Sequence, residues 1–303
     1  MKQVEKYLLK VALLLGIFIM PFAASAEEID MKEKVTINDQ IANTLFIPLY
    51  MRFKESRRPN GIMNDHLACE LINRIDYDFS QFDKAPLSEL GCVVRGCYFD
   101  RKVQEFILRE PSPIVVNIGC GLDTRFQRIT ERRNATFYEL DLPEVIDLRK
   151  EFLPIEPADI NLRGSMLDTD WMDRLKSKHP QSRFIFIIEG VVMYFTNEQV
   201  KSVLSHLAKR FPGGEIHLDV CGSMFQKKGI KPDALKNNNE ARMLSAIDNG
   251  RVIEQWIPQL KMTDNILYQN IEKKRWGAFG VFCRMFPGLS RKFSHLLGYK
   301  IIE

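Results

Sequence analysis

The central part of the chain alternates between short apolar runs and longer amphipathic stretches, and this alternation restricts the fold more than any other feature. We predict strands at the apolar runs, which lie at 114–118, 136–141, 183–190 and 215–221, with a weaker one at about 159–164. Segments whose apolar residues have helical spacing lie between these strands, at 123–133, 142–152 and 196–211. Buried strands that alternate with helices predict an α/β fold with a doubly wound parallel sheet.

Two flanking sections lack this alternation. Before the core, helical patterns lie at 35–56, 65–76 and 101–110, with the turn-forming segment RRPNG at 57–61 between the first two. We interpret residues 35–110 as a helical cover. After residue 222 the pattern weakens, and we predict only a helix near 240–256, a helix near 272–285 and a closing strand near 299–302.

The first 26 residues have the layout of a signal peptide. A basic start is followed by the apolar run VALLLGIFIMPF at 11–22 and by a small-residue pattern that ends at Ala26. Twelve helical residues span about 18 Å, which is less than the roughly 30 Å of a hydrocarbon core. We therefore predict a leader at 1–26 and no membrane span in the mature domain. A buried N-terminal helix and a second translation start at Met31 are the alternatives.

Composition narrows the functional classes. The chain has 303 residues, of which 45% are hydrophobic and 27% charged, and this is ample for one large domain. A formal net charge of +4, part of it within the leader, gives no electrostatic case for nucleic acid. The six cysteines are scattered, so we predict neither a metal site nor a disulfide framework.

The strand at 114–118 is followed by a glycine-pinched turn, Gly119-Cys120-Gly121. In a doubly wound sheet, ligands bind beyond the carboxyl ends of the strands, and glycines let the main chain approach a ligand closely. A Walker loop is excluded, because no Gly-Lys-Ser/Thr follows. The dinucleotide fingerprint fits poorly too, since it needs glycine where Thr124 stands.

The next strand in the sequence ends in two carboxylates, Glu139 and Asp141. An acidic side chain about 20 residues after the glycine turn can accept hydrogen bonds from ribose hydroxyls. The alternative is that these carboxylates cap the helix at 142–152. A glycine turn without a phosphate grip, combined with a ribose acceptor, is compatible with S-adenosylmethionine.

Three segments in order resemble the motifs of the leucine carboxyl methyltransferase family, including its bacterial members that act on small molecules such as polyketides. They are VVNIGCGLDTRFQRI, FYELDLPEVIDLRKE and FIIEGVVMYFTNEQV. Upstream, ESRRPNGIMNDHLACELI and VVRGCYFD are similar to the region that precedes the core in that family. The resemblance covers roughly residues 38–222 and implies a Rossmann-like methyltransferase sheet with S-adenosylmethionine as cofactor.

The resemblance also implies roles for individual residues. Arg95 would bind the methionine carboxylate of the cofactor, Gly119 and Gly121 would pass close to its amino acid tail, and Asp141 would bind the ribose. Glu189 would face the α-ammonium group or the reaction centre. The chemistry of the side chains agrees, because a guanidinium matches a carboxylate bidentately and because Glu189 ends an apolar strand, where a carboxylate without a partner is costly. A surface arginine is the alternative for Arg95.

One motif departs from the family. Members usually carry an Asp-Leu pair after the third strand that meets the adenine, whereas this chain has Ser165-Met166. Ser165 could accept from the adenine amine, or Asp168 could take its place. Cys120 replaces a common alanine, which we interpret as a small filler.

Methyl transfer asks little of the protein beyond positioning, because the sulfonium methyl group is already an electrophile. A carboxylate acceptor would need no general base, whereas a hydroxyl acceptor would. His66, His206 and Tyr194 are the candidate bases, and Glu189 and Tyr194 are the candidate catalytic residues. We expect an O-methyltransferase that acts on a small molecule, with the domain at 31–303 divided into the cover, a cofactor core at 111–222 and a substrate section at 223–303.

The leader conflicts with this function, because S-adenosylmethionine is made in the cytosol. We therefore expect a cytoplasmic catalytic domain, with initiation at Met31, an uncleaved anchoring leader or true export as the alternatives. A non-catalytic nucleoside-binding protein and an NAD-dependent oxidoreductase are the rival functions. The segment KKRWGAFGVFCRMF at 273–286 allows membrane association, although a packed helix with a basic end is the simpler interpretation.

Overall fold

The computed structural model describes residues 32–39, 41–227, 230–236, 238 and 240–302. The residues from Glu33 onward form one compact unit. The predicted leader at 1–26 and the second start at Met31 lie outside the described residues. No helix among the described residues is long and apolar enough to cross a membrane.

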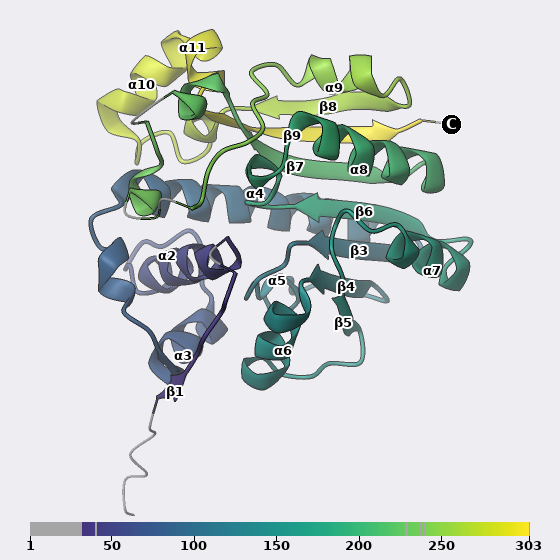
Figure 1. The fold of residues 1–303 in the computed structure, drawn as a ribbon, viewed down its shortest axis with the longest axis horizontal. Helices are drawn as coiled ribbons and strands as arrows, with labels where there is room; N and C mark the ends of the chain where they lie inside the picture. Colours follow the sequence, from purple (N-terminus) through teal and green to yellow (C-terminus); the bar gives the residue numbers. More distant parts are fainter. Residues whose placement is uncertain (1–31, 40, 228–229, 237, 239, 303) are drawn as a thin grey trace, which may run out of the picture. The chain divides into compact units, whose positions relative to one another are not determined.

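A seven-stranded sheet forms the centre of the Glu33–Glu303 unit (Figure 1). In spatial order its strands are β5 (Asp159–Arg163), β4 (Thr136–Asp141), β3 (Pro113–Ile118), β6 (Arg183–Ile188), β7 (Glu215–Cys221), β9 (Ser294–Ile301) and β8 (Leu260–Ile266). The first five strands are parallel. Strand order reverses between β3 and β6, so a doubly wound α/β fold is confirmed and its crevice lies beside β3.

Alternate residues of β3 face two different helical layers. Ile114 and Val116 pack with α7 (Asp170–Lys178), α8 (Asn197–Arg210) and α9 (Arg251–Trp256). Val115 packs with α4 (Pro86–Arg109) and α5 (Arg125–Arg128) on the opposite face. Burial on both faces explains why these strands are continuous apolar runs in the sequence.

The N-terminal cover is helical, as predicted. It contains η1 (Ala42–Leu45), α2 (Phe46–Ser56), α3 (His66–Arg74) and η2 (Phe79–Phe82), with a two-stranded parallel sheet of β1 (Glu33–Lys34) and β2 (Ile75–Asp76). These elements share a hydrophobic cluster with α6 (Pro143–Phe152) and with Leu122 of the glycine turn. The cover therefore packs directly on the loop that follows β3.

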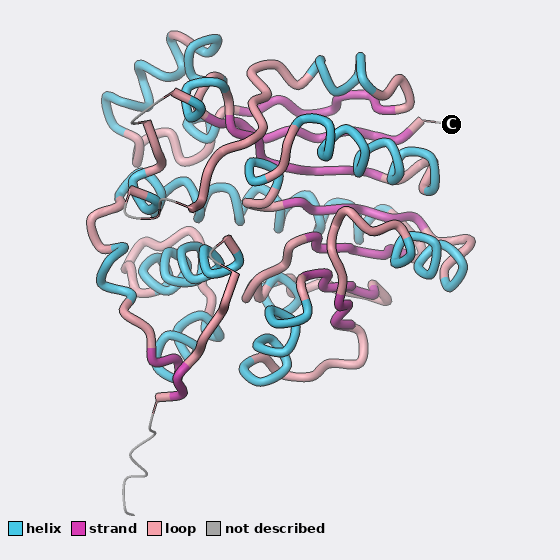
Figure 2. The backbone as a smooth tube through the Cα atoms, viewed as in Figure 1, coloured by secondary structure: helices cyan, strands magenta, loops and turns pink. Residues whose placement is uncertain are grey.

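The C-terminal section differs most from the sequence predictions. Strand β9 runs antiparallel to both β7 and β8, so one edge departs from the parallel arrangement that the alternation indicates. β8 was not predicted, because only Leu260 of its seven residues is fully buried. The helix expected near 240–256 shortens to α9, and Figure 2 shows mainly loop before it. The helix expected near 272–285 begins later, as α10 (Gly277–Met285), and is followed by α11 (Pro287–Arg291).

Three helices of the core and cover also differ. α4 has 24 residues, more than twice the predicted 101–110, because Gly91 and Gly96 lie inside it without ending it. A Cβ at Gly96 would lie 2.9 Å from Met63 Cε, so this glycine lets the helix pack closely. α5 is a single turn rather than the expected 123–133. α7 was not predicted, since only Trp171, Met172 and Leu175 of this polar segment are buried.

Candidate functional site

A cavity of about 820 Å³ opens at the carboxyl ends of β3, β4, β6 and β7, where strand order reverses. Small-molecule sites commonly occupy roughly 300–1,000 Å³. Most of the residues singled out in the sequence line it: Arg95, Gly119, Gly121, Asp141, Ser165, Met166, Glu189 and Tyr194. Sequence segments as distant as α4 and β6 thus meet at one site.

The glycine turn after β3 forms one wall of this cavity. Gly119 and Gly121 have φ values of 71° and 51°, in the left-handed region that favours glycine. The N–H groups of Gly119 and Cys120 both donate to the carbonyl of Leu140, at 2.8 and 3.1 Å. A Cβ added at Gly119 would overlap the side chain of Val191. The turn is thus fixed against β4 and against the loop after β6.

Asp141 holds the turn from the end of β4. Its Oδ2 accepts from the N–H of Gly121 at 2.8 Å, and its Oδ1 accepts from the N–H of Leu142 at 2.7 Å. Burial raises the pKa of Asp141 above its ordinary value, although these two hydrogen bonds oppose the shift. The carboxylate lines the cavity and keeps lone pairs for a ligand hydroxyl.

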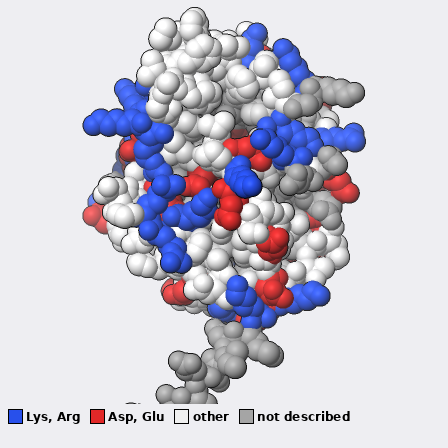
Figure 3. All heavy atoms as spheres, turned by 90° about the vertical axis from the view of Figure 1, so that its left-hand side faces the viewer, with Lys and Arg blue, Asp and Glu red and all other residues white. Residues whose placement is uncertain are grey.

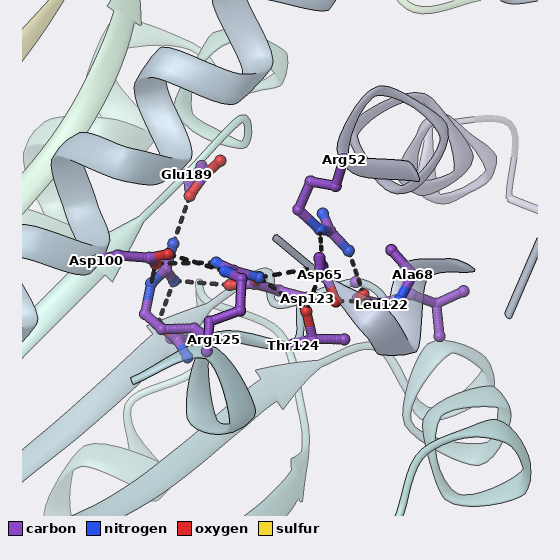
Figure 4. A network of polar contacts seen from close by, with 12 residues as sticks. Arg52, Asp65, Ala68, Asp100, Leu122, Asp123, Thr124, Arg125 and Glu189 are labelled. Atoms are coloured by element: carbon purple, nitrogen blue, oxygen red, sulfur yellow. Dashed lines mark hydrogen bonds and ion pairs between the residues drawn. The ribbon is translucent and has the colours of Figure 1, made fainter. Parts of the chain in front are cut away.

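Two buried arginines bind the carbonyls of the same turn. Arg149 of α6 donates from Nη1 to the carbonyls of Gly121 (2.9 Å) and Asp123 (2.7 Å). Arg52 of α2 donates to the carbonyl of Leu122 at 2.7 Å and pairs with Asp65 at 2.7 Å (Figure 4). The N–H and C=O groups of the turn therefore have partners in β4, α6 and the cover.

Arg125 lies at the centre of a charged network below the turn (Figure 4). Its side chain is 1% exposed and pairs with Asp100 (2.9 Å), Asp123 (2.8 Å) and Glu189 (2.6 Å). Burial would lower the pKa of Arg125, but these three carboxylates hold it above its ordinary value. Burial would likewise raise the pKa of Asp123, but Arg125 and Arg128 lower it. The ion pairs therefore favour the charged forms of Arg125 and Asp123.

The structure brings Arg95 and Glu189 together. Arg95 Nε donates to Glu189 Oε1 at 3.0 Å, and Nη1 donates to Asp219 Oδ2 at 2.9 Å. Asp219 also accepts from the N–H of Gly190 at 2.6 Å and from the hydroxyl of Tyr268 at 3.1 Å. Arg95 and Glu189 therefore form adjacent cationic and anionic groups at the cavity wall.

Glu139 does not reach the cavity. Its Oε1 accepts from Asn117 Nδ2 at 2.7 Å, and its Oε2 lies 3.7 Å from Nη2 of Arg149. Burial raises its pKa to about 8, with Arg149 opposing the shift and Asp159 adding to it. Glu139 is therefore a buried group that supports Asn117, which does line the cavity.

Ser165 and Met166, where the sequence departs from the family motif, both line the cavity. Two hydrogen bonds between neighbouring residues close the loop that contains them. The N–H of Ser165 donates to Asp168 Oδ2, and the N–H of Leu167 donates to Ser165 Oγ, each at 3.1 Å. Asp168 is absent from the cavity lining, so it shapes the loop rather than replacing Ser165.

Of the three candidate bases, only Tyr194 lines the cavity. Burial raises the pKa of Tyr194 to about 12, so the phenol is protonated at neutral pH. His66 is exposed at the start of α3. In α8, Nδ1 of His206 lies 3.0 Å from Nη1 of Arg210. No histidine occurs among the described residues that line the cavity.

Part of the cavity lining is aromatic. It comes from the loop after β6, from the segment after β7 and from the C-terminal section: Phe195, Phe225, Tyr268, Trp276, Phe279 and Phe293. Two further carboxylates of the lining bind backbone N–H groups. Asp39 accepts from Ile41 and Ala42, and Asp233 accepts from the first residues of α4.

Sequence reasoning missed the charged residues that hold the site together. Arg52, Arg125, Arg149 and Asp219 are all buried, and Asp219 lies inside a strand that is buried along six of its seven residues. A charge within such a strand needs a partner, and this signal could have identified Asp219. The three arginines also bind residues far away in the sequence, such as Leu122 for Arg52 and Glu189 for Arg125, and no local pattern indicates these contacts.

Known methyltransferases resemble this chain in sequence. A sequence model described as leucine carboxyl methyltransferase matches residues 46–208, more than half of the chain. The tetracenomycin polyketide synthesis O-methyltransferase TcmP of Streptomyces glaucescens is 25% identical over 232 residues, which cover 74% of this chain and 82% of TcmP. The S-adenosyl-L-methionine-dependent methyltransferase dpfgK of Gibberella zeae is 26% identical over 268 residues, or 82% of this chain and 89% of that protein.

Two solved structures share the fold. A candidate methyltransferase from Thermobifida fusca superposes with a TM-score of 0.56 at 10% identity, covering 94% of this chain and all of that one. A DUF574 family protein from Streptomyces avermitilis also gives 0.56, at 9% identity, over 86% of this chain and 97% of that one. At these identities the likeness concerns the fold alone.

Gly119→Ala tests the packing of the turn. We expect the substitution to lower the free energy of unfolding by about 2 kcal/mol or more, because a left-handed conformation costs a residue with a Cβ roughly 1–2 kcal/mol and the added methyl group overlaps Val191. Urea unfolding measures the change. Gly288→Ala is the control, since a Cβ there meets nothing within 4 Å. An equal loss in the free energy of unfolding in the two variants would contradict the close packing of Gly119 against Val191.

Glu139→Gln tests the buried carboxyl. Because the pKa of Glu139 is raised from 4.5 to about 8, the folded chain keeps its proton where the unfolded chain has released it. This stabilisation is complete below pH 4.5 and is lost as the pH rises through 8.

We therefore expect the free energy of unfolding of the wild type to fall, relative to that of Glu139→Gln, as the pH is raised from 5 to 8. Urea unfolding at several pH values measures both slopes. Exposed Glu131, changed to Gln, is the control that should keep the wild-type slope. Parallel curves for the wild type and Glu139→Gln would refute the buried, protonated state.

Proposed function

The chain belongs to the leucine carboxyl methyltransferase family, and on that premise we propose that it is an S-adenosylmethionine-dependent O-methyltransferase that methylates a small molecule. The observation that carries the proposal is a single cavity whose lining combines two chemically different groups of residues. One group comprises the glycine turn, Asp141 and the Arg95–Glu189 pair. The other group is aromatic. A charged nucleoside donor and an apolar acceptor suit these two groups respectively.

The cofactor is S-adenosylmethionine, and the charged and polar residues of the lining offer partners for each of its parts. An amino acid tail is a zwitterion, so Arg95 would bind its carboxylate and Glu189 its ammonium group. Asp141 would accept from the ribose hydroxyls, and Ser165 and Met166 would border the adenine. When bound, the cofactor would supply an electrophilic methyl group, and these residues would hold it in the cavity. Glu139 is not part of this proposal.

We favour a carboxylate over a hydroxyl as the acceptor group. A carboxylate needs no proton removed, whereas a hydroxyl needs a general base near neutral pKa. The described cavity residues include no histidine, and the Tyr194 phenol stays protonated. Asp39 and Asp233 bind backbone N–H groups. Tyr194 would then act as a hydrogen-bond donor beside the acceptor rather than as a base.

The domain boundaries and the compartment are also proposals. We propose a methyltransferase domain at 31–303 whose cover, core and substrate section keep the predicted limits, and we place it in the cytoplasm, where the cofactor is made. N-terminal sequencing of the endogenous protein tests the compartment. We expect the chain to begin at Met1 or Met31. A mature chain that begins at Glu27 outside the cytoplasm would rule this out.

Asp141→Asn tests the cofactor site. We expect the affinity for S-adenosylmethionine to fall by about 10- to 100-fold, because a charge-assisted hydrogen bond of roughly 1.5–3 kcal/mol is lost. Isothermal titration calorimetry with the full chain measures this affinity. Equal melting temperatures of the wild type and the variant would show that the fold is unchanged. Asp168→Asn is the matched control, since that carboxylate lies near the cavity without lining it.

Transfer itself is measured with a labelled methyl group. Production of S-adenosylhomocysteine with an aromatic carboxylic acid would support the proposal, and faster turnover with hydroxyl acceptors would overturn the carboxylate preference. Binding of the cofactor without any product across an acceptor panel would favour a non-catalytic protein. Binding of NAD in its place would favour an oxidoreductase.

A further inference from the structure

The helices α10 and α11 present an apolar surface to the outside of the molecule. Six large side chains on these helices and at the junction between them are between 41% and 65% exposed: Phe279, Val281, Phe282, Met285, Phe286 and Leu289. We call these six residues the α10–α11 surface. Single exposed apolar side chains are ordinary, but a contiguous group of this kind marks an interaction site.

The exposure follows from how α10 packs. Its inner side buries Gly280 and Cys283, and Trp276, directly before the helix, is buried in the hydrophobic cluster that contains α4. The phenylalanines of the helix lie on its exposed side. By contrast, α8 also packs on the core, but its outward positions carry Lys201 and Lys209.

Basic residues border this surface. Between residues 272 and 292 the chain has six basic side chains and only one acidic one, a net charge of +5 in a chain whose total is +4. Lys273, Lys274 and Lys292 are exposed and form no ion pair with the described residues. In Figure 3 the upper part, where α10 and α11 lie, is uncharged, and basic side chains lie at its margins.

We propose that the α10–α11 surface docks on an anionic lipid bilayer. Helical segments with exposed phenylalanine and leucine between basic residues bind at the headgroup boundary, through apolar burial and attraction to anionic lipids. A second copy of the chain fits less well, because a symmetric contact would bring two groups of lysines of the same sign together. The surface is also continuous with the cavity, since Phe279 belongs to both.

Hydrogen exchange on the full chain tests the docking. We expect exchange within 277–291 to slow when vesicles containing phosphatidylglycerol are added, and to be unchanged with pure phosphatidylcholine vesicles. High salt should reverse the protection. The readout is local to 277–291, so lipid binding by the apolar run at 11–22 does not affect it.

Two variants complete the test. Phe282→Glu should reduce co-sedimentation with the anionic vesicles and abolish the protection at 277–291. Ile155→Glu introduces the same charge at an exposed apolar residue after α6 and should behave as wild type. Unchanged melting temperatures show that both variants are folded.

Two results would overturn the proposal. One is unaltered exchange at 277–291 with anionic vesicles. The other is protection that rises with protein concentration in the absence of vesicles, which would identify a second copy as the occupant. The experiment contains neither methyl donor nor acceptor, so its outcome is independent of the proposed transfer.

Discussion

The buried guanidinium group of Arg125 sets the condition that the rest of the site must satisfy. A cation with 1% exposure is tolerated only where carboxylates surround it, because desolvation otherwise outweighs any packing gain. Its three partners come from α4, from the glycine turn and from the exit of β6. The charge of one side chain thus requires three separate segments to meet at the carboxyl edge of β3.

The series of ion pairs continues outward from Arg125. Glu189 joins it to Arg95, and Arg95 continues to Asp219 of β7. Arg52 of α2 and Arg149 of α6 bind the carbonyls of the turn. The hydrophobic clusters stabilise the two faces of the sheet, whereas these charged contacts fix the geometry at its edge. A ligand that enters therefore meets groups that are already oriented.

Sequence patterns report burial, and they succeeded where burial decides the structure. The strand predicted at 136–141 has the bounds of β4, and the helix predicted at 196–211 differs from α8 by one residue at each end. Gly119 and Gly121 could be identified because a sharp turn directly after a strand favours glycine. α7 and β8 were missed because few of their residues are buried.

Contacts between residues far apart in the sequence decide where the other candidate residues lie. Glu139 and Asp141 lie on the same face of β4, but Asn117 and Arg149 hold Glu139 away from the cavity. Nothing within the segment TFYELD distinguishes the two carboxylates. Likewise, His66 and His206 come from motifs near the core in sequence, yet α3 and α8 leave both outside the cavity. Such outcomes depend on three-dimensional neighbours that a single sequence does not contain.

The direct pairing of Arg95 with Glu189 has a consequence for turnover. Under the proposed roles, both side chains contact only the amino acid tail, which is chemically identical in the donor before and after it has lost its methyl group. This end of the cavity therefore cannot tell a fresh donor from a spent one. Discrimination must come from the surroundings of the sulfur, where the positive charge disappears, and exchange of the spent molecule is governed there.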